Sequence, residues 1–84
     1  MREVFVANGV RAYVLIQTAV SAAHVAGEIG QLPGVESAED VSGPYDVIVR
    51  VSAPDMDALG QMVVQRIQNV DGITRTLTCP IVTL

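Results

Sequence analysis

The sequence predicts an α+β fold with the element order βαββαβ in a single domain. Two short apolar runs of similar composition, YVLIQTA starting at Tyr13 and DVIVRVS starting at Asp46, are each followed by a helical segment and a glycine turn. The turns LPGV at 32–35 and VDGI at 70–73 repeat in the same order as the strands. An internal repeat of this kind indicates one supersecondary plan used twice.

Both expected helices are amphipathic. The first is predicted to begin near Ser21, a good N-cap, and the second carries Asp55 and Asp57 at its positive N-terminal end. Gly34 and Gly72 follow the helical segments, where a left-handed closing residue is expected. Apolar residues recur at spacings of three and four and so share one face of each helix: Ala22, Val25, Ile29 and Leu32 in the first, and Met56, Leu59, Val63, Ile67 and Val70 in the second.

Two βαβ units joined by a hairpin at 42–45 describe a ferredoxin-like sandwich, in which four antiparallel strands carry both helices on one face. The other face is bare, and Tyr13, Leu15 and Ile48 alternate along its strands with the residues that face the helices. Half of the 84 residues are hydrophobic and 17% are charged, which is more apolar surface than so small a chain readily buries alone. We therefore expect a dimer through the bare sheet.

The first residues allow two interpretations. The Asn8-Gly9 pair between apolar runs is a strong hairpin signal and favours a small extra strand, whereas an extension outside the fold explains the segment nearly as well. The predicted organisation is an N-terminal extension over 1–11 and one domain over 12–84.

Composition argues against several classes of protein. The net charge is −4 and the five basic residues are scattered, so no basic stripe is expected to bind nucleic acid directly. The uncharged stretch 12–27 is too short and too polar to span a membrane, and its plan recurs in the second half, which argues against a signal peptide. One cysteine, Cys79, is compatible with a cytoplasmic protein and is expected to be a packing residue.

Candidate catalytic and metal-binding groups are few. The chain has one histidine and one cysteine, and its carboxylates form no pair at ligand or acid-base spacing. His24 lies off the apolar face with Glu28 one turn later, which favours a solvated helix residue. No catalytic residue, metal ion or cofactor is expected.

Polar chemistry concentrates at the hairpin in VSGPYDVIVRV, where Asp46 opens an apolar strand. One interpretation is that Asp46 only braces the turn. In the other, it binds an ammonium group while the backbone N–H groups at Gly43 receive a carboxylate, which suits a free amino acid. The last strand, TRTLTCP, places Thr74, Thr76 and Thr78 on one side; strand propensity alone explains this row, or it extends the site.

The segments LPGVESAEDVSGPYDVIVRV and GITRTLTCPIVTL resemble the ligand-binding, or effector, domain of the Lrp/AsnC family of transcriptional regulators. The resemblance covers residues 12–84. It implies a ferredoxin-like fold, dimers through the sheet, octameric or similar rings, and an amino-acid effector bound between dimers. The effector contacts that it carries over to this sequence are Gly43, Tyr45, Asp46, Thr74, Thr76 and Thr78.

The full-length regulators place a helix-turn-helix before this domain, and the sequence lacks one. The expectation is therefore a stand-alone amino-acid sensor that acts indirectly in transcription, with a full-length Lrp/AsnC regulator as a second partner. Two alternatives stand: a small cofactor-free enzyme of the dimeric α/β-barrel type, and a purely structural interaction module.

Overall fold

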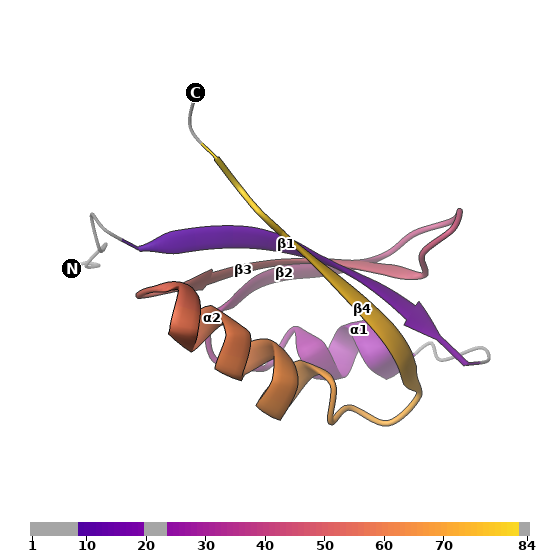
Figure 1. Ribbon diagram of the computed structural model, residues 1–84. Helices are drawn as coiled ribbons and strands as arrows, with labels where there is room; N and C mark the ends of the chain where they lie inside the picture. Colours follow the sequence, from indigo (N-terminus) through magenta and orange to yellow (C-terminus); the bar gives the residue numbers. More distant parts are fainter. Residues whose placement is uncertain (1–8, 20–23, 83–84) are drawn as a thin grey trace.

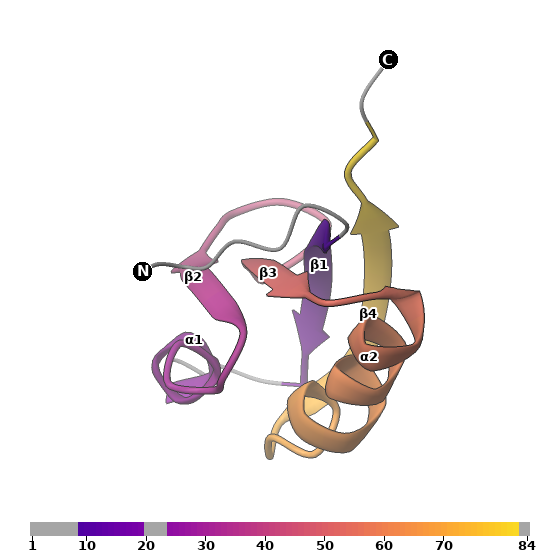
Figure 2. The ribbon, with the colours of Figure 1, turned by 90° about the vertical axis from the view of Figure 1, so that its left-hand side faces the viewer.

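The computed structural model of the protein describes residues 9–19 and 24–82 (Figure 1). The elements are β1 (Val10–Thr18), α1 (His24–Ile29), β2 (Val35–Asp40), β3 (Val47–Ala53), α2 (Met56–Met62), which continues as the π-helix η1 (Val63–Ile67), and β4 (Ile73–Pro80). The sheet order is β2-β3-β1-β4, and all three neighbouring pairs are antiparallel. Both helices lie on the same face of the sheet (Figure 2). The predicted ferredoxin-like sandwich is confirmed.

The core lies between the sheet and the helices and follows from strand alternation. In β1 and β3 every second residue is buried, and these residues pair directly across the strands, as Val14 does with Val49. Each buried aliphatic side chain of this size contributes about 1.5–3 kcal/mol through burial. No polar residue of the described chain is buried, and the core consists of Ala12, Val14, Ile16, Val25, Ile29, Val47, Val49, Val51, Leu59, Val63 and Ile67.

The predicted apolar stripe of the second helix is wrong at one end. Leu59, Val63 and Ile67 are buried, but the side chain of Met56 is 53% exposed. Asp55 caps the helix, since its Oδ1 accepts a hydrogen bond from the Ala58 N–H at 2.8 Å. Met56 is the first helical residue, so it lies at the end of the helix, before the buried part of the stripe begins at Leu59. The predicted start of the first helix at Ser21 lies outside the described residues, as does Asn8 of the predicted N-terminal hairpin.

Three glycines adopt positive φ, and two of them confirm the predicted helix ends. Gly34 (φ 89°) and Gly72 (φ 99°) turn the chain from each helical segment into the following strand. The third, Gly43 (φ 140°), lies in the hairpin between β2 and β3. The Val41 N–H donates to the Asp46 carbonyl at 2.9 Å and closes that hairpin loop.

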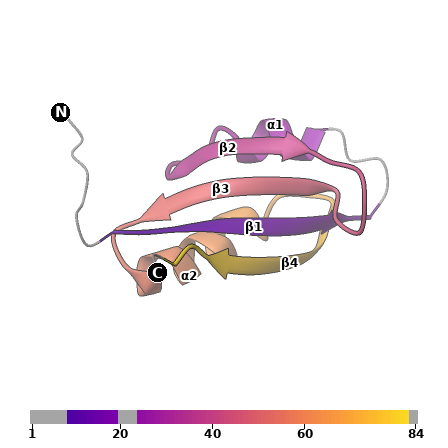
Figure 3. The same cartoon turned by 90° about the horizontal axis from the view of Figure 1, so that it is seen from above.

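The face of the sheet opposite the helices is the bare face, seen from above in Figure 3. Tyr13 and Leu77 are 40% and 47% exposed there, and Leu15 and Ile48 are half-buried and pair with each other. Tyr13, Leu15 and Ile48 thus point away from the helices, as predicted. Cys79 pairs with Tyr13 and is exposed, so the prediction that it is a buried packing residue is wrong, because its side of β4 faces away from the core.

Candidate functional site

Three segments meet at one end of the sheet around Asp46. The Asp46 side chain accepts a hydrogen bond through Oδ2 from the Thr18 backbone N–H at 2.8 Å. The Asp46 backbone N–H donates to the Ile16 carbonyl at 2.8 Å, and Gln17 Nε2 donates to the Pro44 carbonyl at 2.9 Å. These bonds join the end of β1 to the hairpin. We call residues 17–18, 43–46 and Thr74 the Asp46 corner.

A β-bulge explains why the start of β4 reaches this corner. The pairing of β1 with β4 shifts between Gln17 and Thr18, so that Thr18 lies opposite Ile73. Such an irregularity leaves a backbone group outside the ladder, and the Thr18 N–H is taken up by Asp46. Thr74 Oγ1 donates to the Gln17 carbonyl at 3.2 Å, which ties the start of β4 to the same place.

The Asp46 corner offers free acceptor positions of the kind that an ammonium group needs. A carboxylate offers about four acceptor positions, and the Thr18 N–H uses one of them. Asp46 and Gly43 are both exposed to solvent. A Cβ added at Gly43 would have no atom within 4 Å, so the backbone there is open to the approach of a ligand. Tyr45 is half-buried between them in the loop.

The three predicted threonines do not converge on this corner. Thr74 lies in it, but Thr76 pairs with the buried Ile16 and its Oγ1 accepts from Gln68 Nε2 at 2.8 Å. Thr78 pairs with the buried Val14 and lies further along the strand. Because their strand partners face the helices, Thr76 and Thr78 face the helix layer as well.

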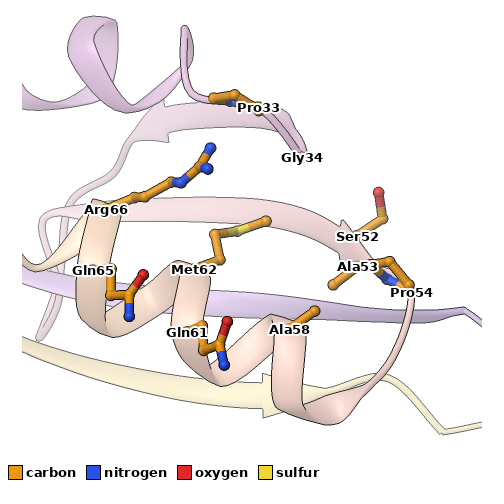
Figure 4. Close-up of a pocket in the computed structure, with 10 residues that line it drawn as sticks. All are labelled: Pro33, Gly34, Ser52, Ala53, Pro54, Ala58, Gln61, Met62, Gln65 and Arg66. Atoms are coloured by element: carbon orange, nitrogen blue, oxygen red, sulfur yellow. The ribbon is translucent and has the colours of Figure 1, made fainter.

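A groove that the sequence did not indicate lies at the opposite end of β3 (Figure 4). It has a volume of about 310 Å³ and runs between the turn at Gly34 and the exposed side of α2. The Ser52 N–H donates to the Gly34 carbonyl at 2.9 Å and holds this end together. Its polar side chains are the Ser52 hydroxyl, the amides of Gln61 and Gln65, and the Arg66 guanidinium. These groups suit an anion or an amide, and the groove contains none of the predicted site residues.

An ion-pair cluster lies on the bare face. Glu36 Oε1 is 2.9 Å from Arg11 Nη2 and 3.2 Å from Arg50 Nε, and Arg50 Cζ lies 5.9 Å from the centre of the Tyr13 ring. The hydrogen bond from Arg11 lowers the pKa of Glu36, and the same bond raises the pKa of Arg11. Sequence reasoning missed this cluster because a shift in the β2–β3 pairing between Val35 and Ser37 places Glu36 there.

The remaining candidates carry no site. No group of three or more histidine, cysteine or acidic side chains lies close enough to hold a metal ion within residues 9–19 and 24–82. His24 is exposed, with Nε2 3.2 Å from the Asp71 carbonyl and 3.8 Å from Glu28 Oε2. None of the helices in the described ranges is long and apolar enough to cross a membrane.

The sheet order and the two helices on one face define the class of the protein, a ferredoxin-like α+β domain. Residues 11–83 match the model of the Lrp/AsnC ligand binding domain, so the chain belongs to the Lrp/AsnC family.

The similar proteins include longer transcriptional regulators and proteins of about the same length as this chain. An uncharacterized HTH-type transcriptional regulator from Pyrococcus furiosus is 28% identical over 83% of this chain and 49% of its own length. The chain therefore spans about half the length of the curated relatives it matches. A solved protein of Thermus thermophilus is 31% identical and superposes with a TM-score of 0.78. The match covers 89% of this chain and 95% of that protein.

A more distant structure shares the fold. The L-methionine complex of a transcriptional regulator from Neisseria meningitidis superposes with a TM-score of 0.80 at 16% identity, over 90% of this chain and 51% of that one.

Proposed function

We propose that this chain is an amino-acid-sensing effector domain that forms ligand-responsive oligomers and acts on transcription indirectly. The observation that carries the proposal is the Asp46 corner, where an exposed carboxylate is held in place by the Thr18 N–H beside an open glycine backbone. An amino acid presents one ammonium and one carboxylate, which match these two kinds of group. A regulator with the same fold is solved with L-methionine, which supports this class of ligand.

Oligomerisation follows from the bare face in this proposal. Two copies pack through their bare faces, and dimers associate further so that the exposed Asp46 corners meet and enclose the ligand. A ligand held between dimers makes different contacts in each assembly state, so it shifts the populations of those states by its difference in affinity. The net charge of −4 favours action through a DNA-binding partner of the same family over direct binding of DNA.

The enzyme alternative has less support. Tyr13 and Arg50, the polar pair that a cavity of the barrel type would use, lie on the bare face and not between the sheet and the helices. The core between the two layers is aliphatic over the described residues, and it offers no acid or base there. The curated Pyrococcus relatives are named as HTH-type transcriptional regulators, and a match to a homocitrate synthase covers 56% of this chain and 10% of that enzyme.

Calorimetry with the common amino acids tests the proposed site. Asp46→Asn keeps an oxygen that can accept from the Thr18 N–H but removes the negative charge. We expect at least one amino acid to bind the wild type and its affinity to fall at least tenfold in Asp46→Asn, because hydrogen bonds to charged groups are worth roughly 1.5–3 kcal/mol.

Two controls separate the alternatives. Asp40→Asn removes the same charge from an exposed position near the hairpin and should leave binding unchanged. Arg66→Ala should also leave it unchanged, whereas loss of binding in this variant alone would move the ligand to the groove of Figure 4. Undiminished binding by Asp46→Asn would leave Asp46 as a brace of the turn and refute the proposed site.

A further inference from the structure

The groove of Figure 4 combines one cationic side chain with an apolar floor. Its volume of about 310 Å³ lies at the lower end of the range for small-molecule sites, which is roughly 300–1,000 Å³. The turn at 33–34 and the end of β3 form one wall. The other wall is a stripe along α2 and η1, because residues three or four apart share one face of a helix: Ala58, Gln61, Met62, Gln65 and Arg66.

The Arg66 guanidinium is the charged group of the groove. Its side chain extends from η1 toward Pro33 in Figure 4. Over residues 9–19 and 24–82, no acidic side chain lies within ion-pair distance of Arg66, and no acidic residue of these ranges lines the groove. A guanidinium presents a planar fork of N–H donors that matches the two oxygens of a carboxylate. The groove thus lacks the anion that its cation suits.

The floor of the groove depends on the contact between Gly34 and Met62. A Cβ added at Gly34 would clash with the Met62 side chain, so the thioether lies directly against the backbone of the turn. Met62 is half-buried and packs against the core. A thioether chain is flexible and polarisable and adapts to apolar groups of different shapes. The floor can therefore accommodate a short apolar chain below the guanidinium.

The polar part of the groove lies on an irregular turn of the helix. Gln65 and Arg66 belong to the π-helix η1, in which the Gln68 N–H donates to the Val63 carbonyl at 2.9 Å. The Gln65 carbonyl accepts from Asn69 Nδ2 at 2.6 Å. Single π-helical turns within helices are rare and occur frequently at functional sites. This observation is independent of the volume and the charge of the groove, and it also favours a ligand site.

We propose that the groove binds a small carboxylate that carries a short apolar chain and no ammonium group. Arg66 binds the carboxylate, the amides of Gln61 and Gln65 donate to it, and the apolar chain lies along Met62. An amino acid is disfavoured, because its ammonium group would lose water without gaining an acidic partner in the groove.

This site is distinct from the Asp46 corner, and the inference goes beyond the proposed function. Asp46 precedes β3 and Ala53 ends it, so the two sites are separated by about 23 Å at the usual rise of a strand. Their preferences are also opposite, since the Asp46 corner offers a carboxylate to an ammonium group and the groove offers a guanidinium to a carboxylate.

Three compounds with one carbon skeleton test the chemistry of the groove: 4-methylpentanoate, its neutral amide 4-methylpentanamide, and leucine. The probe is the methyl NMR signal of Met62 in protein labelled with ¹³C at the methionine methyl groups. We expect 4-methylpentanoate to shift this signal saturably, while the signal of Met56, which does not line the groove, stays in place. The amide and leucine should bind the groove about tenfold more weakly or less, because each loses the match to a charged hydrogen-bonding group.

Three variants locate the ligand. Arg66→Gln should lower the affinity for 4-methylpentanoate about tenfold, since it removes a charged hydrogen-bond donor. Arg75→Gln removes the same charge from an exposed position on β4 outside the groove and should leave the affinity unchanged. Ala58→Leu should abolish binding by filling the groove while the helix stays intact, because leucine is a good helix former. Circular dichroism of each variant checks that the fold is retained.

The outcomes distinguish this inference from the proposed function. Asp46→Asn should bind 4-methylpentanoate like the wild type, whatever its effect on amino-acid binding. Absence of a saturable shift at Met62, undiminished binding by Arg66→Gln, or leucine binding at the groove as tightly as 4-methylpentanoate would each overturn the carboxylate site and leave the Asp46 corner unaffected.

Discussion

Glu36 is the residue whose chemistry depends most on the fold. It enters the bare face through a shift in strand pairing and lies against two arginines, Arg11 at 2.9 Å and Arg50 at 3.2 Å. These contacts favour its ionised form and lower its pKa below the ordinary value of 4.5, with the Arg11 hydrogen bond as the main cause. Without that carboxylate, two guanidinium groups would share the same stretch of sheet.

Stability should therefore depend on Glu36 in a defined pH range. A lowered pKa in the folded state means that the contribution is fully present above the ordinary value of 4.5 and is lost as the pH falls through the lower folded value. We expect the difference in melting temperature between the wild type and Glu36→Gln to be constant above about pH 5 and to shrink in more acidic solution. A difference that stays the same throughout would show that the ion pairs are not responsible.

At the scale of elements, Gly34 in the turn between α1 and β2 can be compared with Gly60 within α2. At Gly34 a Cβ would clash with the Met62 side chain and lie 3.0 Å from the Ser52 carbonyl, and φ is +89°. At Gly60, within α2, a Cβ would meet nothing within 4 Å. The same substitution should thus have opposite effects at the two positions.

Urea unfolding of the two alanine variants measures this contrast. Gly34→Ala should lose roughly 2 kcal/mol, because the left-handed conformation alone costs about 1–2 kcal/mol for other residues. Gly60→Ala should gain about 0.5–1 kcal/mol from helix propensity. Equal losses at both positions would contradict this account of the turn at Gly34.

The elements also show which features of this chain are readable from sequence. Strand alternation, the internal repeat and the glycine turns depend on local rules, and they predicted the fold and the bare face correctly. The features that were missed depend on register. The bulge after Gln17 and the pairing shift beside Glu36 decide which polar groups meet, and a single sequence carries no direct signal for them. The threonines of β4 are a further example. Their alternate spacing places them on one side of the strand, but that this side faces the helices depends on the pairing of Thr76 with Ile16 and of Thr78 with Val14.

For the whole molecule, the bare face is the surface on which the account depends. Leu77 on this face is 47% exposed and Val64 on η1 is 59% exposed. Replacing either aliphatic side chain by a charged one should therefore lower the stability of the isolated chain by a similar amount. A dimer through the bare face would bury Leu77 and leave Val64 at the outer surface. A charge buried without a partner is strongly destabilising to an interface.

Sedimentation equilibrium of the wild type, Leu77→Glu and Val64→Glu over a wide range of concentration tests this most directly. We predict that the wild type and Val64→Glu form dimers or multiples of dimers, and that Leu77→Glu sediments as a folded monomer. A wild type that stays monomeric at high concentration, or a Leu77→Glu variant that associates as strongly as the wild type, would contradict the account.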